Sequence, residues 1–241
     1  MSTERVTVVV PTYNELENLP ELATAVTRHG YRLLIVDDSS PDGTGALADR
    51  IAEGNSLVFT LHRSEKQGLG RAYAAAFDAL LAEEAADIII EMDADFSHDP
   101  SDLPRLVKAI EDGADVAIGS RYVPGGSTPD WPLLRRLISK CGNLYARLML
   151  GIPVHDATAG FRAFKAAALA NLPYRGSQAS GYGFQVEMAW RAHQKGLIIT
   201  EVPISFRDRT RGQSKMGPGI VAEAMWLVTR WGLGRLLGRS S

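Results

Sequence analysis

The sequence contains little cysteine and no excess of charge of either sign. Cys141 is the single cysteine in 241 residues, so the chain cannot form an intrachain disulfide. This indicates either a reducing compartment or a protein that is indifferent to redox conditions. Because Cys141 falls within an apolar helical pattern, we expect a packed thiol there and not a nucleophile. The formal net charge of -2 gives no global electrostatic reason to bind nucleic acid, so we expect no such partner.

Long apolar runs are also absent. The most apolar stretch, residues 220–237, is interrupted by Glu223, Arg230 and Arg235, so it is not expected to span a membrane. Residues 1–5 have neither the basic nor the apolar region of a signal peptide. These absences predict a cytoplasmic protein.

Two glycine-rich phosphate-binding motifs are missing. No G-x-G-x-x-G follows the first apolar run, and no Walker A motif occurs anywhere in the chain. The short stretch Gly68-Leu69-Gly70 is a weak signal by itself. The sequence therefore argues against a dinucleotide-binding or P-loop protein.

The first half of the chain alternates short apolar runs with helical patterns. Strands are predicted at residues 6–10, 32–36, 57–61, 88–92 and 116–119, and helices at 16–29, 44–53, 70–84 and 101–112. Nearly continuous apolar strands that alternate with helices are typical of a mostly parallel sheet covered on both faces. The sequence predicts an α/β fold with a doubly wound, mostly parallel sheet.

The second half has a different pattern. It predicts a helix at residues 131–150, a strand at 160–164, a helix at 184–194, a strand at 197–206 and a basic loop at 207–216. No linker rich in proline or serine divides the chain. We therefore expect one domain over residues 1–216, followed by an amphipathic helical extension over residues 217–241 that lacks transmembrane helices.

Polar segments directly follow four of the predicted strands. They are PTYNE at residues 11–15, DDSSPDG at 37–43, DAD at 93–95 and SRY at 120–122. In an open α/β sheet the ligand binds outside the carboxyl ends of the strands. We therefore expect these four segments to converge on one crevice.

Asp93 and Asp95 are separated by one small residue, a spacing that can direct two carboxylates at one divalent ion. Mg²⁺ and Mn²⁺ accept carboxylate oxygens and retain positions for water and phosphate. The alternative is that acids at a strand end cap the next helix, a role that suits Asp99 or Ser101 better. The two aspartates alone leave metal binding and capping equally supported.

Five motifs together resemble a known family. PTYNE, DDSSPDGT at residues 37–44, DAD, GSRYV at 119–123 and GQSK at 212–215 resemble the family 2 glycosyltransferases of the polyprenol (dolichol) phosphate mannose synthase type, over about residues 6–216. The resemblance implies a GT-A nucleotide-sugar-binding fold. It also implies inverting transfer of mannose from GDP-mannose to a polyprenyl phosphate.

The resemblance implies roles for individual residues. Asp93 and Asp95 would bind Mg²⁺ or Mn²⁺ and the donor diphosphate, while Arg209 and Lys215 would close over that diphosphate. Arg121 and Arg135 would hold the acceptor phosphate. The residues expected to bind the donor nucleotide are Pro11, Tyr13, Glu15, Val36, Asp38, Asp93, Ala94 and Asp95, with Val36 lining the base site.

An acceptor of this kind changes what catalysis requires. A phosphate monoester has a second pKa of about 6, so it is largely dianionic at neutral pH and needs no strong general base. A sugar hydroxyl acceptor would need a base to remove its proton. Asp156 and Glu187 are the candidates in the crevice if a base is used.

The basic residues of the predicted helix 131–150 allow two interpretations. They form either an ordinary solvated face or, together with Trp226, Trp231 and the basic residues near them, a surface for an anionic bilayer. The second interpretation predicts a peripheral protein on the cytoplasmic face of a membrane. Its partner there is the membrane surface or a separate membrane-anchoring protein.

Other functions remain open at this point. One is transfer of glucose from UDP-glucose to the same kind of lipid. A second, from a different class, is a catalytically silent module that binds a nucleotide sugar. A soluble nucleotidyltransferase fits less well, because the basic and apolar second half would then have no role.

Overall fold

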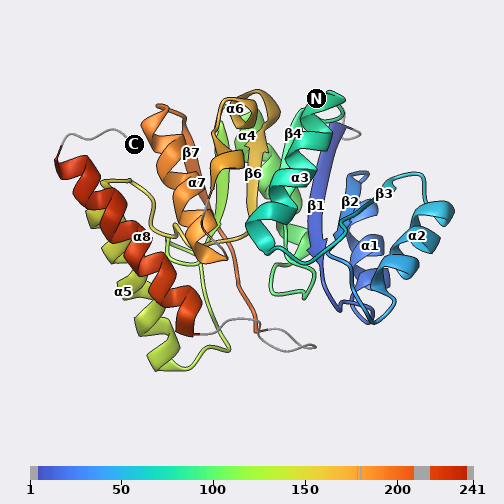
Figure 1. Ribbon diagram of the computed structural model, residues 1–241, viewed down its shortest axis with the longest axis horizontal. Helices are drawn as coiled ribbons and strands as arrows, with labels where there is room; N and C mark the ends of the chain where they lie inside the picture. Colours follow the sequence, from blue (N-terminus) through green and yellow to red (C-terminus); the bar gives the residue numbers. More distant parts are fainter. Residues whose placement is uncertain (1–4, 178, 180, 209–217, 238–241) are drawn as a thin grey trace.

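The computed structural model describes residues 5–177, 179, 181–208 and 218–237, and its centre is a seven-stranded sheet (Figure 1). The strand order is β3-β2-β1-β4-β6-β5-β7. The strands are β1 (Val6–Thr12), β2 (Arg32–Asp37), β3 (Val58–His62), β4 (Ile88–Glu91), β5 (Val116–Ser120), β6 (Arg162–Lys165) and β7 (Ile199–Pro203). Each coincides with a predicted strand, with its ends shifted by a few residues.

The sheet is mostly parallel, as predicted. β6 is the exception, because it pairs antiparallel with both β4 and β5. The other neighbouring pairs are all parallel. The insertion of β6, which is late in the sequence, between two earlier strands is not visible in the apolar pattern of the chain.

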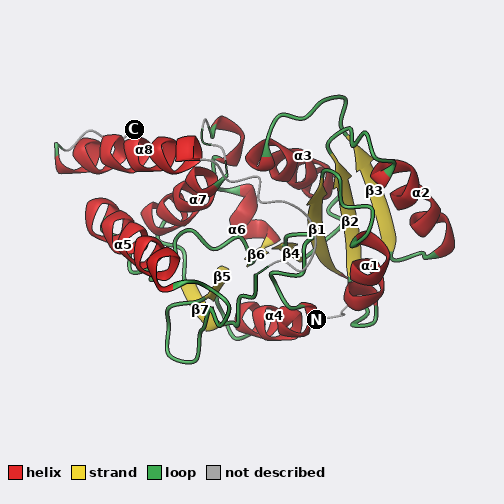
Figure 2. Cartoon of the chain, turned by 90° about the horizontal axis from the view of Figure 1, so that it is seen from below, coloured by secondary structure: helices red, strands yellow, loops and turns green. Residues whose placement is uncertain are grey.

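Helices cover both faces of the sheet, because successive strand residues point to opposite sides. Val8 and Val10 of β1 pack in one core with α1 (Leu19–Thr27), α2 (Thr44–Gly54) and α4 (Leu103–Glu111). Val9 faces the second core, which contains α3 (Leu69–Ala82), α6 (Ala166–Ala170) and α7 (Tyr182–Gln194). Figure 2 shows α1 and α4 on one side of the sheet, with α3 and α7 on the other. The doubly wound arrangement is confirmed.

The two long helices α5 (Leu133–Leu150) and α8 (Pro218–Leu236) lie side by side at the β7 end of the sheet, and α8 also packs on α7 (Figures 1 and 2). The division into a domain of residues 1–216 and an extension of residues 217–241 stays a prediction. Among the described helices, none combines the length and the apolar character needed to cross a membrane.

One side of α5 carries large apolar side chains that are more than half exposed. We call this set the α5 face: Leu133, Leu134, Leu137, Ile138, Leu144 and Leu148. Cys141 is also exposed, so the prediction of a packed thiol is wrong. The reason is that α5 packs on the domain through its other side, where Asn143, Ala146 and Leu150 are buried.

Candidate active site

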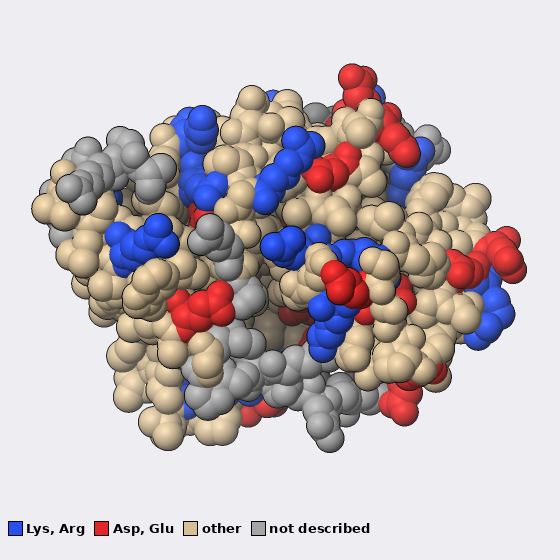
Figure 3. All heavy atoms as spheres, viewed as in Figure 1, with Lys and Arg blue, Asp and Glu red and all other residues tan. Residues whose placement is uncertain are grey.

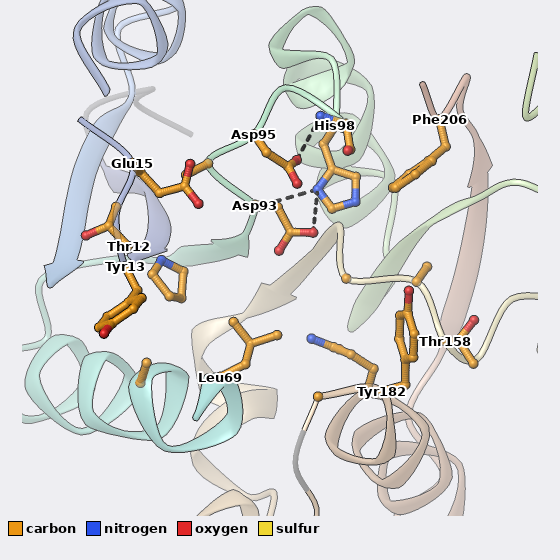
Figure 4. A pocket seen from close by; sticks show the side chains of 18 of the residues that line it. Thr12, Tyr13, Glu15, Leu69, Asp93, Asp95, His98, Thr158, Tyr182 and Phe206 are labelled. Carbon is orange, nitrogen blue, oxygen red and sulfur yellow. Dashed lines mark hydrogen bonds and ion pairs between the residues drawn. The ribbon is translucent and has the colours of Figure 1, made fainter. Parts of the chain in front are cut away.

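A cavity of about 360 Å³ opens where β1, β2, β4 and β5 end (Figure 4). Residues from all four predicted polar segments line it: Pro11, Tyr13, Glu15, Asp38, Asp93, Ala94, Asp95 and Arg121. The predicted convergence of the segments is therefore confirmed. Arg135 reaches the same cavity from α5. Figure 4 shows Tyr13 and Glu15 on one side, Thr158 and Tyr182 on the other, and the two aspartates between them.

Asp93 and Asp95 both belong to the turn that follows β4. Asp95 is 7% exposed, and one of its carboxylate oxygens accepts the backbone N–H of Ser97 at 3.0 Å. Helix capping is done by Asp99, which accepts the backbone N–H of Ser101 at 2.8 Å. The capping explanation therefore does not account for the two aspartates of the cavity.

His98 is hydrogen-bonded to the backbone of this turn. Its Nδ1 accepts the backbone N–H of Asp93 at 3.2 Å, so the ring proton of the neutral imidazole is on Nε2. The ring is 2% exposed and stacks on Phe161 at a centroid distance of 5.0 Å. Burial lowers the pKa of His98, with the nearby Asp93 and Asp95 acting in the opposite direction. The ring therefore acts as a rigid, neutral support for Asp93.

The described residues contain no group of three or more His, Cys, Asp or Glu side chains that could hold a metal ion. Asp93 and Asp95 form a pair of oxygen ligands only. A hard divalent ion can be bound by one or two carboxylates when a substrate phosphate completes its coordination. The carboxylate pair therefore fits an ion that arrives together with a diphosphate.

The β1–β2 side of the cavity combines an aromatic ring with charged groups. The ammonium of Lys66 lies 3.7 Å from the centre of the Tyr13 ring. Asp38 forms an ion pair with Arg63, yet its pKa is raised because burial outweighs the attraction of that guanidinium. Lys66 lines the cavity but was missed, since a lone lysine in a polar loop gives no signal in a sequence. Val36 is fully buried in β2 and is not part of the cavity wall.

The β5 side of the cavity holds Arg121 in a fixed position. Its Nε and Nη2 donate to the Asp156 carboxylate at 2.7 and 2.6 Å, and Nη2 also donates to Thr158 at 2.8 Å. Burial lowers the pKa of Arg121, but the Asp156 carboxylate outweighs burial and raises it. The residue is 5% exposed, so Arg121 is a buried, permanently charged group in the cavity wall.

Arg135 and Arg121 both lie near the ring of Trp131. The Arg135 guanidinium is 4.1 Å from the ring centre of Trp131, and that of Arg121 is 5.3 Å from it. Arg135 also forms an ion pair with Asp208 at 2.9 Å. Two cationic groups on one aromatic ring are attracted by the face of that ring. This geometry brings two guanidinium groups, each paired with an aspartate, to one end of the cavity.

The prediction that Asp156 and Glu187 lie in the crevice is wrong, because neither lines the cavity. Asp156 is fully buried, and its carboxylate is occupied by Arg121. Glu187 lies on α7 and accepts hydrogen bonds from Ser177 and Arg191. Of the predicted catalytic residues, Arg209 and Lys215 lie outside the described residues.

A layer of buried polar side chains lies behind the wall of the cavity, and sequence reasoning missed it. We call it the buried polar layer: Tyr73, Glu91, Arg162 and Gln185. Burial raises the pKa of Glu91 from 4.5 to about 8, Arg162 counteracts this shift and Asp93 adds to it. In the sequence Glu91 is simply the last residue of an apolar strand. Its polar neighbours can be found only from the tertiary structure.

The raised pKa of Glu91 predicts a pH dependence of stability. Between pH 4.5 and about 8 the folded protein keeps a proton that the unfolded chain has released, so the free energy of unfolding falls as the pH rises. The slope is at most about 1.4 kcal/mol per pH unit. We expect Glu91→Gln to remove most of it, as measured by urea unfolding at pH 5.5 and 7.5 with EDTA present. Equal slopes in the variant and the wild type would contradict this prediction.

The chain is similar to known proteins along nearly its whole length. A family model described as glycosyl transferase family 2 matches residues 7–172. The chain is 47% identical over 239 residues to the polyprenol monophosphomannose synthase of Mycolicibacterium smegmatis, covering 97% of this chain and 89% of that protein. It is 49% identical over 233 residues to the undecaprenyl-phosphate mannosyltransferase of Micrococcus luteus, covering 95% and 94%.

Two further comparisons extend this result. The dolichol-phosphate mannosyltransferase of Pyrococcus furiosus is 35% identical over 218 residues, which cover 88% of this chain and 59% of that protein. The solved structure of glucosyl-3-phosphoglycerate synthase from Mycobacterium tuberculosis superposes with a TM-score of 0.67 at 19% identity, covering 95% of this chain and 80% of that one. That likeness concerns the fold alone. The family model and the relatives together place the chain in glycosyl transferase family 2, as a glycosyltransferase with a GT-A fold.

Proposed function

We propose that this protein transfers mannose from GDP-mannose to a polyprenyl phosphate with inversion at the anomeric carbon. The observation that carries the proposal is the polarity of the cavity, which has two carboxylates in its middle and two arginines at its β5 end. The names of the relatives point to the same acceptor class and the same sugar. An acceptor of this class is already an anion, so the reaction needs no strong general base.

The acceptor phosphate is proposed to bind Arg121 and Arg135. Arg121 offers donors from a buried position that Asp156 holds in place, so little conformational freedom is lost on binding. Guanidinium groups suit phosphate because their N–H donors match its oxygens. The two arginines would aim a phosphate oxygen at the anomeric carbon and need not remove a proton.

The donor is proposed to lie along the other side of the cavity. The guanosine part would contact Pro11, Tyr13, Glu15 and Asp38, with Tyr13 available for stacking on the base. The diphosphate would lie at Asp93, Ala94 and Asp95, and Arg209 and Lys215 would cover it. Val36 is not among the proposed contacts, since its side chain is fully buried and does not line the cavity.

Mg²⁺ or Mn²⁺ is the proposed cofactor, and Asp93 and Asp95 would hold it. Their carboxylate oxygens line the same cavity, and they match the hard-ligand preference of both ions. When bound, such an ion neutralises negative charge on the leaving diphosphate. His98 would keep Asp93 in place through the backbone hydrogen bond to Nδ1.

The α5 face is proposed to rest on a phospholipid bilayer on its cytoplasmic side. Over the end of the molecule where α8 lies in front of α5, Figure 3 shows uncharged side chains with separate basic and acidic groups among them. The same helix carries the basic residues Arg136, Lys140 and Arg147, which suit anionic headgroups. It also carries Arg135, which lines the cavity. A bilayer on this face would therefore bring the phosphate of a polyprenyl lipid close to Arg121 and Arg135.

Leu137→Asp tests the membrane proposal. Leu137 is 59% exposed, and burial of a leucine side chain contributes about 1.5 kcal/mol or more, so binding to anionic phospholipid vesicles should fall about tenfold or more. The measurement is co-sedimentation at fixed salt concentration. Ile198→Asp is the matched control, because Ile198 is also 59% exposed but lies next to β7. Equal loss in both variants would contradict the proposal, and a wild type that stays in solution would favour a separate membrane-anchoring protein.

The catalytic proposal is tested by transfer of labelled mannose. The purified protein is incubated with GDP-mannose, a polyprenyl phosphate and Mg²⁺ or Mn²⁺, and the label extracted into organic solvent is counted. We expect lipid-linked product that EDTA abolishes. Product from UDP-glucose alone would replace the proposed donor, whereas donor binding without any product would favour a silent nucleotide-sugar-binding module.

A further inference from the structure

Gln185 has unusual surroundings for a residue in the wall of a cavity. It lies in the first turns of α7 and lines the cavity, yet it is 1% exposed. Neither its Nε2 nor its Oε1 has a hydrogen-bond partner among the described residues. Buried amide groups in native proteins are almost always paired, with protein, with water or with a ligand. We therefore expect the amide of Gln185 to bind a partner in the cavity.

The neighbours of Gln185 share this property. Both carboxylate oxygens of Glu91 and the hydroxyl of Tyr73 are buried without a partner among the described residues. Gln185 lies close enough to Glu91 to lower the pKa of that carboxyl, although no hydrogen bond of normal geometry joins them. The buried polar layer thus gathers donors and acceptors behind one part of the cavity wall. A partner that both donates and accepts hydrogen bonds would suit this place.

The backbone of Gln185 is held firmly. Arg162 is fully buried, and its guanidinium donates to the carbonyl oxygens of Gln185 and Ala157 at 2.7 Å and of Ala159 at 2.8 Å. This single side chain therefore connects the first part of α7 with the loop that supplies Ala159 and Gly160 to the cavity. The wall around Gln185 is a preorganised surface.

This wall borders the place proposed for the diphosphate. A Cβ added at Gly160 would lie 3.8 Å from Oδ2 of Asp93. In the sheet, β4 and β6 lie between the β1–β2 side, where the nucleoside is proposed to bind, and the β5 side, where Arg121 lies. A group between the diphosphate and the acceptor phosphate is the transferred sugar. The position of Gln185 in the fold therefore matches the position of the donor sugar.

We propose that Gln185 binds a hydroxyl group of the donor sugar and contributes to the selection of that sugar. The inference rests on the proposed function. A pyranose hydroxyl both donates and accepts, as does the amide, and a neutral amide adds no charge beside the diphosphate. Sites that hydrogen-bond a substrate hydroxyl reject analogues that lack it, because the buried protein group is then left unpaired.

The test compares the binding of GDP-mannose with that of GDP, which lacks the sugar, by calorimetry with Mn²⁺ present. For Gln185→Leu we expect the Kd of GDP-mannose to rise about tenfold, while that of GDP stays within about twofold. Gln194→Leu is the matched control, because Gln194 is exposed on the same helix. Gln185→Glu, which keeps the size and one acceptor, is the second variant if the leucine variant does not fold.

The outcomes separate this inference from the proposed function. If Gln185→Leu changes the Kd of GDP-mannose and of GDP equally, or changes neither, the proposed role of Gln185 is wrong. If the wild type binds no GDP-mannose, the proposed function fails, and the same comparison is made with the nucleotide sugar that it does bind and the matching diphosphate. A selective loss of the sugar nucleotide in that pair would still support Gln185 as the sugar-binding residue.

Discussion

The Asp95→Asn substitution is expected to lower the rate of mannosyl transfer about a thousandfold. Asparagine has nearly the same shape, but it removes a charge from a residue that is 7% exposed in the centre of the cavity. Loss of one preorganised electrostatic group in an active site typically costs a factor of about 100 to 1,000. We expect the upper end of that range, because a weaker metal site and weaker diphosphate binding act together.

The measurement is initial-rate transfer of labelled mannose over a range of Mn²⁺ concentrations. Asp99→Asn is the matched control, since Asp99 is in the same turn but is exposed and caps the next helix. Asparagine is an equally good N-cap, so the control should keep its activity within about twofold. A variant at position 95 with nearly full activity would remove the carboxylate pair from the mechanism.

The Arg162→Leu substitution is expected to lower the free energy of unfolding by about 3–5 kcal/mol, the usual effect of breaking a buried charged network. Arg162 is fully buried, and burial lowers its pKa to about 10 although Glu91 counteracts this shift. The substitution leaves three carbonyl oxygens without their donor. It also leaves Glu91 without its cationic neighbour.

Urea unfolding of the two proteins at one pH gives the measurement. Arg162→Lys keeps the charge but cannot reach three carbonyl groups at once, so it should lose most of the same free energy. Arg105→Leu is the control on the surface: Arg105 pairs with Asp102 on the exposed side of α4, and its loss should cost less than about 1 kcal/mol. A change below about 1 kcal/mol for Arg162→Leu would show that the guanidinium is not needed for this wall.

Much of the fold follows from the sequence for a local reason. Short runs of apolar residues such as Ile88 to Ile90 are typical of buried strands, and the helices between them have a different period. Because parallel strands end at the same edge of a sheet, the polar segments after them have to meet. That is why the sequence is enough to assign Tyr13, Asp93 and Arg121 to one site.

The sequence is a poorer guide wherever a side chain has more than one possible neighbour. The sequence makes Asp156 a candidate base, yet this residue holds Arg121 in place with two short hydrogen bonds. The helical pattern predicts a packed Cys141, yet α5 turns its wide apolar face outward. Both errors have the same cause, since a sequence pattern shows which residues share a face or a loop but not which partner they meet in the folded domain.

The sequence by itself determined the α/β class, the positions of the strands along the chain and the polar segments that meet at the cavity. These features depend on neighbours within a few positions along the chain and on the geometry of parallel strands. Only the tertiary structure decided that β6 enters between β4 and β5, and that Arg162 and Gln185 then meet Glu91 behind the cavity. These contacts join Glu91 to residues 71 and 94 positions further along the chain, and the free energy of burial that selects them is a property of the whole fold.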